Sequence, residues 1–259
     1  MVHPRPDERP RGVQSVDRAL DILELLASRP GTLGVTEIAR GTGLAPGTAH
    51  RLLVGLAQRG WVRQDPGRRY GVGPGALRIG GAAATTLAVV AAPALRTAVE
   101  VTGETANLAS LDGDVMVYVA QSPSPHTLRI FAEVGRPVPL HSTAVGKVVL
   151  AGMAPGPAME LLAGTRRTAR TPHTLTDLAQ LRDELDRVRE QGWAMDDEEQ
   201  ELGVRCVAVP VATGSAWTRM ALSVSGPTER MSRDRAVAVV PDLRRIAEDL
   251  GRRELGAAG

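Results

Sequence analysis

The sequence is poor in cysteine, aromatic residues and lysine. Its 259 residues include one Cys, three Trp, two Tyr and one Phe, and Lys147 is the only lysine. A single cysteine excludes an intramolecular disulfide framework and a multi-cysteine zinc site, and it suits a reducing cytoplasm. With so few aromatic rings, the core must be built from Ala, Val, Leu and Ile. The sequence predicts a cytoplasmic protein that needs no cofactor or metal.

A secretory signal and a clear membrane-spanning run are also missing. The first 14 residues are polar and rich in proline, which predicts a flexible arm. The longest uncharged run, Ile79–Leu95, consists mostly of Ala, Gly and Thr, contains Pro93, and is barely long enough to cross a bilayer. We therefore expect a helix buried against protein here, and no membrane partner.

Charge is unevenly distributed along a chain of otherwise ordinary globular composition, 43% apolar and 23% charged. Residues 1–75 contain 11 Arg and 7 acidic residues, a balance of +4 that leaves −2 for the remainder of a chain with net charge +2. A basic front with a slightly acidic back permits an anionic partner, such as nucleic acid, for the front alone.

Three helices and a hairpin are predicted near the N-terminus. Apolar residues at helical spacing predict a first helix with Ser15 as its N-cap, which ends at Pro30-Gly31. A second, short helix follows Thr36 as its cap. After a turn containing Gly41 and Gly43, a third helix starts at Pro46 and ends at Gly60. Residues 61–64 and 68–72, joined by a turn of Asp, Pro and Gly, predict a β-hairpin.

This order of elements is that of a winged helix-turn-helix, in which the third helix enters the DNA major groove. Arginines on the hairpin suit phosphate contacts, and Arg51 suits a contact to guanine. The alternative is that these side chains are ordinary solvated surface residues. The candidate DNA-binding residues are Thr36, Pro46, Gly47, Thr48, His50, Arg51, Arg63, Arg68 and Arg69.

The remainder of the chain predicts a linker helix at 74–92 and then an α/β domain of mostly antiparallel strands, so that the fold class is α+β. The expected strands are 105–110, 115–121, 128–134, 204–211 and 217–225, with a hairpin turn at 112–114. The expected helices are 94–101, 143–152, 176–191 and 232–250.

The two halves together resemble one family. SVDRALDILELLA and TEIARGTGLAPGTAHRLLVGLAQRGWVRQDPGRRYGVGPGALRIG are similar to the winged helix-turn-helix of the IclR family of bacterial transcriptional regulators. LHSTAVGKVVLAGM, GWAMDDEEQELGVRCVAVPVA and ALSVSGP are similar to its effector-binding domain. Gly47 departs from the family, which often has a polar or charged residue there.

The resemblance implies a domain plan and a way of working. A DNA-binding domain at 15–73, a linker helix at 74–92 and a GAF-like effector-binding domain at 93–252 follow the arm at 1–14. The family forms dimers through the N-terminal domains and linker helix, and often tetramers through the effector domains. A small organic effector changes the affinity of the family's proteins, which are commonly repressors, for double-stranded operator DNA.

The resemblance also implies an effector pocket around Cys206. Ser223 and Ser225 share one face of a strand, so two hydroxyls, a thiol and the Asp196 carboxylate suit a small polar acid. The free amides at the start of the helix after Thr143 suit the ligand's acid group. Scarce aromatic residues favour a small aliphatic acid. The candidate effector-binding residues are Ala144, Val145, Asp196, Val204, Cys206, Ser223 and Ser225.

Other interpretations of these residues remain open. Cys206 is alternatively a small buried hydrophobic residue, and Lys147 a structural residue extending from the first turns of its helix. The acidic run at 196–199 is expected to be a solvated loop, or alternatively a ligand set for a hard metal. Two further functions compete with the regulator: an enzyme with Cys206 as nucleophile and His141 as base, and a C-terminal domain that only dimerises.

Overall fold

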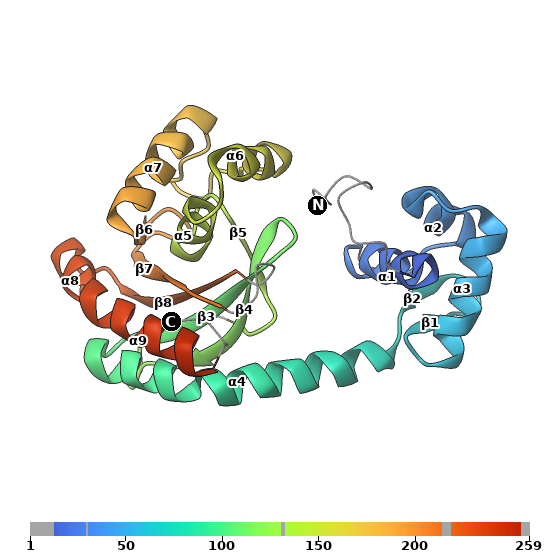
Figure 1. Cartoon of the computed structure of the whole chain (residues 1–259), viewed down its shortest axis with the longest axis horizontal. Coiled ribbons are helices and arrows are strands. Elements are labelled where there is room, and N and C mark those ends of the chain that lie inside the picture. The colour runs from blue at the N-terminus through green and yellow to red at the C-terminus, as the bar shows by residue number, and fades with distance from the viewer. Residues whose placement is uncertain (1–12, 30, 131–132, 214–218, 255–259) are drawn as a thin grey trace. The chain divides into compact units, whose positions relative to one another are not determined.

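The structure of the chain is a computed structural model that describes residues 13–29, 31–130, 133–213 and 219–254 (Figure 1). The arm predicted at 1–14 therefore lies almost entirely outside the described residues.

The N-terminal elements match the predicted winged helix-turn-helix. Helices α1 (Gln14–Ala27), α2 (Val35–Thr42) and α3 (Pro46–Gln58) precede a hairpin of β1 (Val62–Gln64) and β2 (Tyr70–Val72). Pro46 is the first residue of α3, as predicted. Their shared core is aliphatic, apart from one tyrosine of the hairpin, and includes Ile22, Leu26, Ile38, Leu53 and Tyr70.

The two N-caps predicted for α1 and α2 are wrong. The N-cap of α1 is Val13 rather than Ser15, and that of α2 is Gly34 rather than Thr36. In α2, the carboxylate of Glu37 accepts a hydrogen bond from the Gly34 backbone N–H at 2.8 Å. This bond from the third helical residue satisfies the N-terminal amide, so α2 begins before the threonine that the pattern selected.

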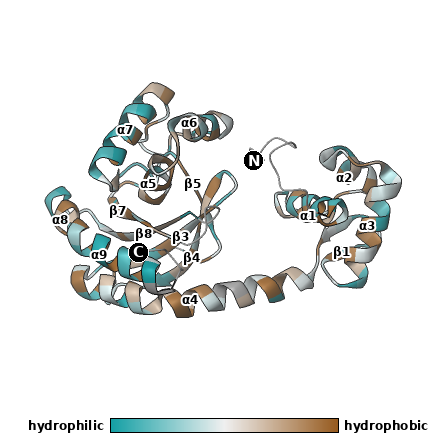
Figure 2. Ribbon diagram, in the orientation of Figure 1, coloured by the Kyte–Doolittle hydropathy of each residue, from teal (hydrophilic) through white to brown (hydrophobic). Residues whose placement is uncertain are grey.

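A single helix, α4 (Pro74–Thr102), occupies the region where the sequence predicted a linker and a separate helix. Pro93 lies inside it and removes the N–H that would bond the Val89 carbonyl. Both residues lie on the exposed side of α4, where water can bind that carbonyl. Hydrophobic residues recur along the whole of α4 (Figure 2).

Among the described residues, α4 is the one helix with the length and apolar composition to cross a membrane. Its C-terminal half has a protein partner instead, because Ala91, Leu95 and Ala98 are buried in the core beneath the large sheet. The burial against protein that we expected for the whole uncharged run at 79–95 is wrong for most of it: of its described side chains only Ala91 and Leu95 are buried, because only the C-terminal half of α4 packs against the sheet.

The C-terminal sheet has six antiparallel strands in the order β5-β4-β3-β8-β7-β6. Their bounds are β3 (Thr105–Asp112), β4 (Val115–Ser122), β5 (Pro137–Pro139), β6 (Ala194–Asp197), β7 (Val204–Val211) and β8 (Met220–Pro227). The strands predicted at 105–110, 115–121 and 204–211 are confirmed. The described part of the strand predicted at 217–225 belongs to β8, and residues 217–218 lie outside the described residues.

The strand predicted at 128–134 is wrong for its described residues, which form no strand. Side chains rather than a neighbouring strand bind its carbonyls. Thr105 Oγ1 donates to the Ile130 carbonyl at 2.9 Å, and the Arg230 guanidinium donates to the Leu128 carbonyl at 2.9 Å. The edge of the sheet is formed instead by the short strand β5, which pairs with β4.

Two helical layers cover the sheet (Figure 1). Helices α5 (Ala144–Ala151), α6 (Pro155–Gly164) and α7 (Leu178–Gln191) lie on one face, and the second half of α4, with α8 (Arg233–Ala238) and α9 (Val240–Glu254), lies on the other. Helix α6 was not predicted. The predicted helix at 232–250 is two helices, because Pro241 suits the first turn of a new helix and not the interior of a continuous one.

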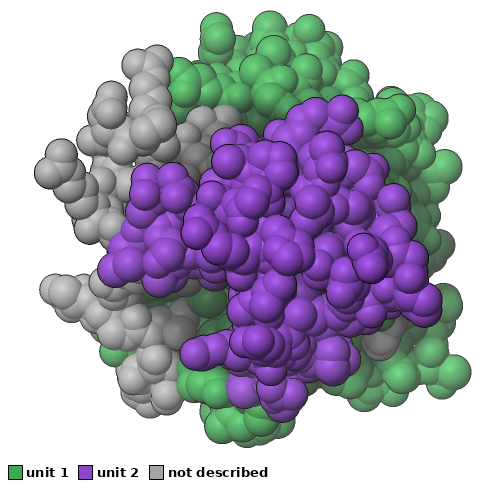
Figure 3. Space-filling model, turned by 90° about the vertical axis from the view of Figure 1, so that its right-hand side faces the viewer, with its two compact units in different colours: residues 1–2, 84–259 green, residues 3–83 purple. Residues whose placement is uncertain are grey.

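Contacts divide the chain between residues 83 and 84 into two compact units (Figure 3). The division falls inside the linker predicted at 74–92. We call residues 3–83 the N-terminal unit and residues 84–259 the C-terminal unit, and describe each by itself.

Candidate functional sites

Helix α3 presents the predicted DNA-binding residues outward. Pro46, Gly47, His50 and Arg51 are exposed and Thr48 is half-buried. The opposite side of the helix is anchored, because Ala49 and Leu53 are fully buried. Thr36 is exposed on α2. The N-terminal unit thus offers a rigidly supported polar helix face.

The hairpin of β1 and β2, with its turn, is here called the wing. Its three arginines differ in the contacts that they make. Arg63 and Arg68 are exposed, and Arg68 adopts the left-handed conformation with φ of 58° at the hairpin turn. Arg69 instead donates to the Thr32 carbonyl at 2.8 Å and lies 3.0 Å from the carboxylate of Glu37. The Gly34 N–H and the Arg69 guanidinium together hold the pKa of Glu37 below its ordinary value. Arg69 therefore ties the wing to α2.

The C-terminal unit contains a cavity of about 130 Å³ on the α5 face of the sheet. Four of the predicted effector-binding residues line it: Asp196, Val204, Cys206 and Ser225. Ser223, two residues before Ser225 on β8, is fully buried. Ala144 and Val145 are buried at the start of α5. The remaining lining residues are Tyr118, Ile130, Arg136, Pro137, Val138, Thr143, Arg170, Gln200 and Glu201.

Helix α5 is held tightly behind this cavity. Thr143 is its N-cap, and the hydroxyl of Thr143 accepts the Gly146 N–H at 3.2 Å and donates to the Pro139 carbonyl at 2.6 Å. A Cβ at Gly146 would lie 2.3 Å from the Leu140 carbonyl oxygen, so only glycine fits here. The first amides of a helix have no partner within it, and they favour anions. The α5 N-terminus beside the cavity-lining Thr143 has this property.

The acidic run at 196–199 is not the solvated loop that we expected. Asp196 and Glu199 are 4% and 6% exposed. Asp196 Oδ1 accepts the backbone N–H groups of Glu199 at 2.8 Å and Gln200 at 3.1 Å. Burial raises the pKa of Asp196 to about 7, although these two hydrogen bonds by themselves lower it. A protonated Asp196 carboxyl is a hydrogen-bond donor to the cavity.

Lys147 is structural, as expected, but it does not reach solvent. Its side chain is 1% exposed, and its ammonium lies 2.5 Å from Glu199 and 3.1 Å from Glu184. Burial alone lowers the pKa of Lys147, but the two carboxylates raise it by more, so the ammonium stays charged. Lys147 thereby fastens the 196–201 segment, which forms one wall of the cavity, to α5 and α7.

Cys206 lies at the centre of a row of polar side chains across the sheet. Its direct neighbours are Asp196 on β6 and Ser225 on β8. Burial and the nearby Asp196 raise the pKa of the Cys206 thiol to about 12, so the thiol is neutral. His141, the proposed base, bonds the Thr168 carbonyl at 3.2 Å through Nε2. Neither group is activated for nucleophilic catalysis.

Of the nine lining residues that were not predicted, the two arginines escaped sequence reasoning because they belong to connecting segments without a pattern. Arg136 and Arg170 are exposed and line the cavity from different loops. An open surface hollow shares Arg170, Gln200 and Glu201 with the cavity, which marks this side as its mouth. Within the described residues, no group of three or more His, Cys, Asp or Glu side chains is arranged to hold a metal. The metal alternative for the acidic run therefore gains no support.

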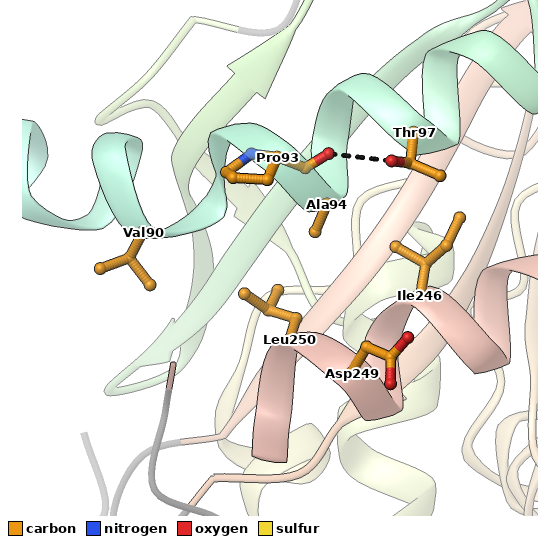
Figure 4. Close-up of a pocket in the computed structure, with 7 residues that line it drawn as sticks. All are labelled: Val90, Pro93, Ala94, Thr97, Ile246, Asp249 and Leu250. Carbon is orange, nitrogen blue, oxygen red and sulfur yellow. Dashed lines mark hydrogen bonds between the residues drawn. The ribbon is translucent and has the colours of Figure 1, made fainter. Parts of the chain in front are cut away.

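A second hollow, of about 200 Å³, lies between α4 and α9 in the C-terminal unit (Figure 4). Its lining is largely aliphatic, and the Thr97 hydroxyl bonds the Pro93 carbonyl of its own helix at 3.2 Å. Asp249 supplies the one carboxylate. The hollow lacks the several convergent polar groups of a small-molecule site, which the Cys206 cavity has.

Comparison with known proteins identifies the family of both parts of the chain. Residues 15–66 match the IclR helix-turn-helix domain, and residues 82–252 match the C-terminal domain of the bacterial transcriptional regulator IclR. The chain is 40% identical over 242 residues to the HTH-type transcriptional regulator BhcR of Paracoccus denitrificans, covering 92% of this chain and 86% of that protein. It is 34% identical over 229 residues to the transcriptional repressor IclR of Escherichia coli, covering 86% and 83% of the two chains.

A solved structure agrees over nearly the whole length. The crystal structure of a putative IclR transcriptional regulator from Silicibacter sp. is 32% identical, with a TM-score of 0.76, and the match covers 95% of this chain and 98% of that one. These relatives are regulators, which confirms the regulator interpretation over the enzyme. The chain belongs to the IclR family of bacterial transcriptional regulators.

Proposed function

We propose that this protein binds double-stranded operator DNA through α3 and the wing, and that a small organic acid in the Cys206 cavity changes this affinity. The observation that carries the proposal is the pairing of a supported, outward polar helix in one unit with an enclosed polar cavity in the other. In keeping with its bacterial relatives, we place its action in the cytoplasm and as a repressor.

The ligand chemistry follows from the cavity wall. Arg136 and Arg170 supply positive charge at the mouth, and the α5 N-terminus adds its dipole. Ser225 and Cys206 offer uncharged hydrogen-bonding groups inside, and Asp196 adds another when it is protonated. The cavity volume of about 130 Å³ is well below the roughly 300 Å³ at which drug-sized pockets begin. A small carboxylic acid with a few carbons fits this set.

Exposed apolar side chains support the proposal that the protein associates with copies of itself. Val13, Val16 and Leu20 of the first helix region are 68%, 53% and 50% exposed, and Leu77 and Val89 of α4 are 78% and 69% exposed. Monomeric proteins seldom leave such residues grouped along one helix. A homodimer through α1 and α4 covers them, and a homotetramer adds contacts between C-terminal units.

The effector must favour one arrangement of the dimer. A ligand shifts an equilibrium only by the difference between its affinities for the two states. We propose that filling the cavity moves the 196–201 wall and α4, and so changes the separation of the two α3 helices on DNA.

A thermal-shift screen of small organic acids against the full chain tests the effector. A ligand at 100 times its dissociation constant stabilises its unit by about 2.7 kcal/mol. Ser225→Ala removes one cavity hydroxyl and is expected to reduce or abolish the shift. Absence of any shift across short-chain mono- and dicarboxylic acids would favour the alternative, a C-terminal unit that only dimerises.

Binding of Arg51→Ala to a selected operator and to random DNA tests the DNA contact. If Arg51 reads a base, the variant loses about 1–3 kcal/mol on the operator and much less on random DNA. An equal loss on both would reduce Arg51 to a phosphate contact.

A further inference from the structure

A buried carboxylate at the junction between α4 and β3 is bound by one arginine. Glu104, two residues beyond the end of α4, is 2% exposed. Arg230, which follows β8, donates from Nε to Glu104 Oε1 at 2.5 Å and from Nη2 to Oε2 at 2.9 Å. A pair with two parallel bonds fixes the orientation of both side chains as well as their distance. Gly226 of β8 leaves room for the pair, because a Cβ there would lie 2.7 Å from Glu104 Cδ.

The same arginine also binds the segment of residues 124–130, which follows β4 and reaches the cavity around Cys206. Arg230 Nη2 donates to the Leu128 carbonyl at 2.9 Å. Two residues farther along, Ile130 lines the cavity. Arg230 therefore bonds at once to the α4–β3 junction and to the segment that forms one wall of the cavity. We call its contacts with the Glu104 carboxylate and the Leu128 carbonyl the Arg230 bridge.

Thr105 and Ser124 join the junction to the same segment. Thr105 Oγ1 donates to the Ile130 carbonyl at 2.9 Å and accepts the Ser124 N–H at 3.2 Å. The Ser124 hydroxyl donates to the Gly103 carbonyl at 2.6 Å. Segment 124–130 forms no strand, so bonds of this kind set its position in place of a sheet register. A shift of the segment therefore acts directly on the junction.

The junction leads into the helix that connects the two units along the chain. Helix α4 is continuous from Thr102 back to Pro74, which belongs to the N-terminal unit. A ligand in the cavity would contact the segment at Ile130, and the Arg230 bridge would pass a shift of the segment to Glu104. Hydrogen-bond networks joined to rigid helices are one physical means of coupling two distant sites.

We propose that Arg230 is a positioning residue that couples the cavity to α4. Without the Arg230 bridge, an acid still binds in the cavity but no longer changes the affinity for operator DNA. This inference rests on the proposed function, in which an effector moves α4, and it names the contact through which the cavity reaches that helix.

Operator affinity of the full chain, measured with and without a saturating acid, tests the inference. The operator is selected from random sequence. The acid is whichever of acetate, propionate, butyrate, lactate, malate and succinate gives the wild type the largest thermal shift. The wild type should show a change in operator affinity of about fivefold or more on adding the acid.

The double variant Glu104→Met/Arg230→Met removes the bridge without leaving a buried charge unpaired, an exchange that is often neutral for folding. It should reduce the effect of the acid on operator affinity to below about twofold. Its affinities for the acid alone and for operator alone should stay within about threefold of the wild type. Arg230→Lys keeps the positive charge but not the planar fork that bonds several oxygens at once, so it should lose coupling as well.

Arg235→Met is the matched control, because Arg235 holds the same end of α4 from another element. It donates from α8 to the Thr102 carbonyl at 2.9 Å, and this bond does not involve segment 124–130. The variant loosens α4 without breaking the Arg230 bridge, so it should keep the wild-type response to the acid.

Three results would overturn the inference and leave the effector function standing, once thermal unfolding has confirmed folding. The first is a wild-type response to the acid in both Arg230 variants. The second is an equal loss of response in Arg235→Met, which would assign the effect to any loosening of α4. The third is a response lost because the Arg230 variants no longer bind the acid. A wild type that shows no thermal shift with any of the six acids would contradict the proposed function, and the inference with it.

Discussion

The two units differ in where they place their candidate functional side chains. In the N-terminal unit the candidate residues of α3 and the wing lie on the surface, and the core beneath them is aliphatic apart from one tyrosine. In the C-terminal unit the candidate residues lie inside: Asp196, Cys206, Ser223 and Ser225 are each at most 6% exposed. The first solution suits a large polyanion that binds from outside, and the second suits a small ligand that must be enclosed.

The difference has an energetic consequence. Exposed charges of the N-terminal unit are solvated, so each contributes little to stability and is available to DNA. Buried polar groups of the C-terminal unit must be partnered by one another or by a ligand, since unpartnered ones are costly. Substitutions should therefore affect binding more than stability in the first unit, and stability as well as binding in the second.

The largest expected effect is that of Lys147→Met. It leaves Glu199 buried without its cation, and removing one partner of a buried pair costs about 3–5 kcal/mol. Chemical denaturation of the C-terminal transition measures the loss. Arg187→Met is the control, because Arg187 contacts Glu184, the other carboxylate beside Lys147, at 2.6 Å but is 70% exposed, so it should cost about 1 kcal/mol or less. Comparable losses in both variants would break the contrast between buried and exposed charges.

Gly146→Ala is expected to come next. The new methyl group would meet backbone atoms of Leu140, which cannot move aside as a side chain does. Overpacking of this kind costs about 1–3 kcal/mol, and it should also weaken ligand binding by displacing the start of α5. Gly156→Ala, in α6, has open space around the added methyl and should leave stability unchanged or raise it by up to about 1 kcal/mol. The unfolding midpoints of the two variants decide the point, and a neutral Gly146→Ala would contradict it.

Asp196→Asn should change the pH dependence of stability. Burial raises the pKa of this carboxyl from 3.8 to about 7. Its favourable contribution is therefore complete below the unfolded pKa of 3.8 and is lost as the pH rises through about 7. The amide cannot ionise, so the variant should be more stable than the wild type at pH 8, by roughly 1–2 kcal/mol, and similar to it near pH 4. A difference that is the same at both pH values would refute the raised pKa.

The smallest expected effect is a difference in the salt dependence of DNA binding between variants of two wing arginines. Arg68→Ala should lower the slope of log affinity for DNA against log salt by about one. Arg69→Ala should change the slope less and cost slightly more stability, because Arg69 is engaged by Glu37 and the Thr32 carbonyl. Equal slope changes for both variants would show that Arg69 releases these partners to contact phosphate.

The sequence predicted local secondary structure better than it predicted the contacts of buried polar side chains. Helix α3 and the alternation of β7 follow from local apolar periodicity, which a single sequence displays. The positions of Ser225 and Cys206 in the cavity wall followed from the family resemblance and the two-residue repeat of strands. The burial of Asp196 and Glu199 did not, because four acidic residues in a row show a solvated pattern until Lys147, some 50 residues away, is placed beside them.

The errors have two physical origins: helix caps assigned to the wrong neighbouring residue, and contacts between residues distant in sequence. The strand predicted at 128–134 failed because Thr105 and Arg230, distant in sequence, bind its carbonyls. The caps predicted at Ser15 and Thr36 failed because Val13 and Gly34, which lack side-chain hydrogen-bonding groups, precede the helices and Glu37 satisfies the second end. Arg136 and Arg170 reach the cavity only through the course of their loops. Local pattern carries no information about such long-range contacts.

The most direct test of the account is the reciprocal coupling between DNA and effector. An operator selected from random sequence is titrated with the full chain, with and without a saturating acid found by thermal shift, and the acid is titrated with and without operator. The account predicts that the acid changes operator affinity by about fivefold or more, that operator changes acid affinity by the same factor, and that Ser225→Ala abolishes both. Operator affinity that is independent of an acid bound in the cavity would contradict it.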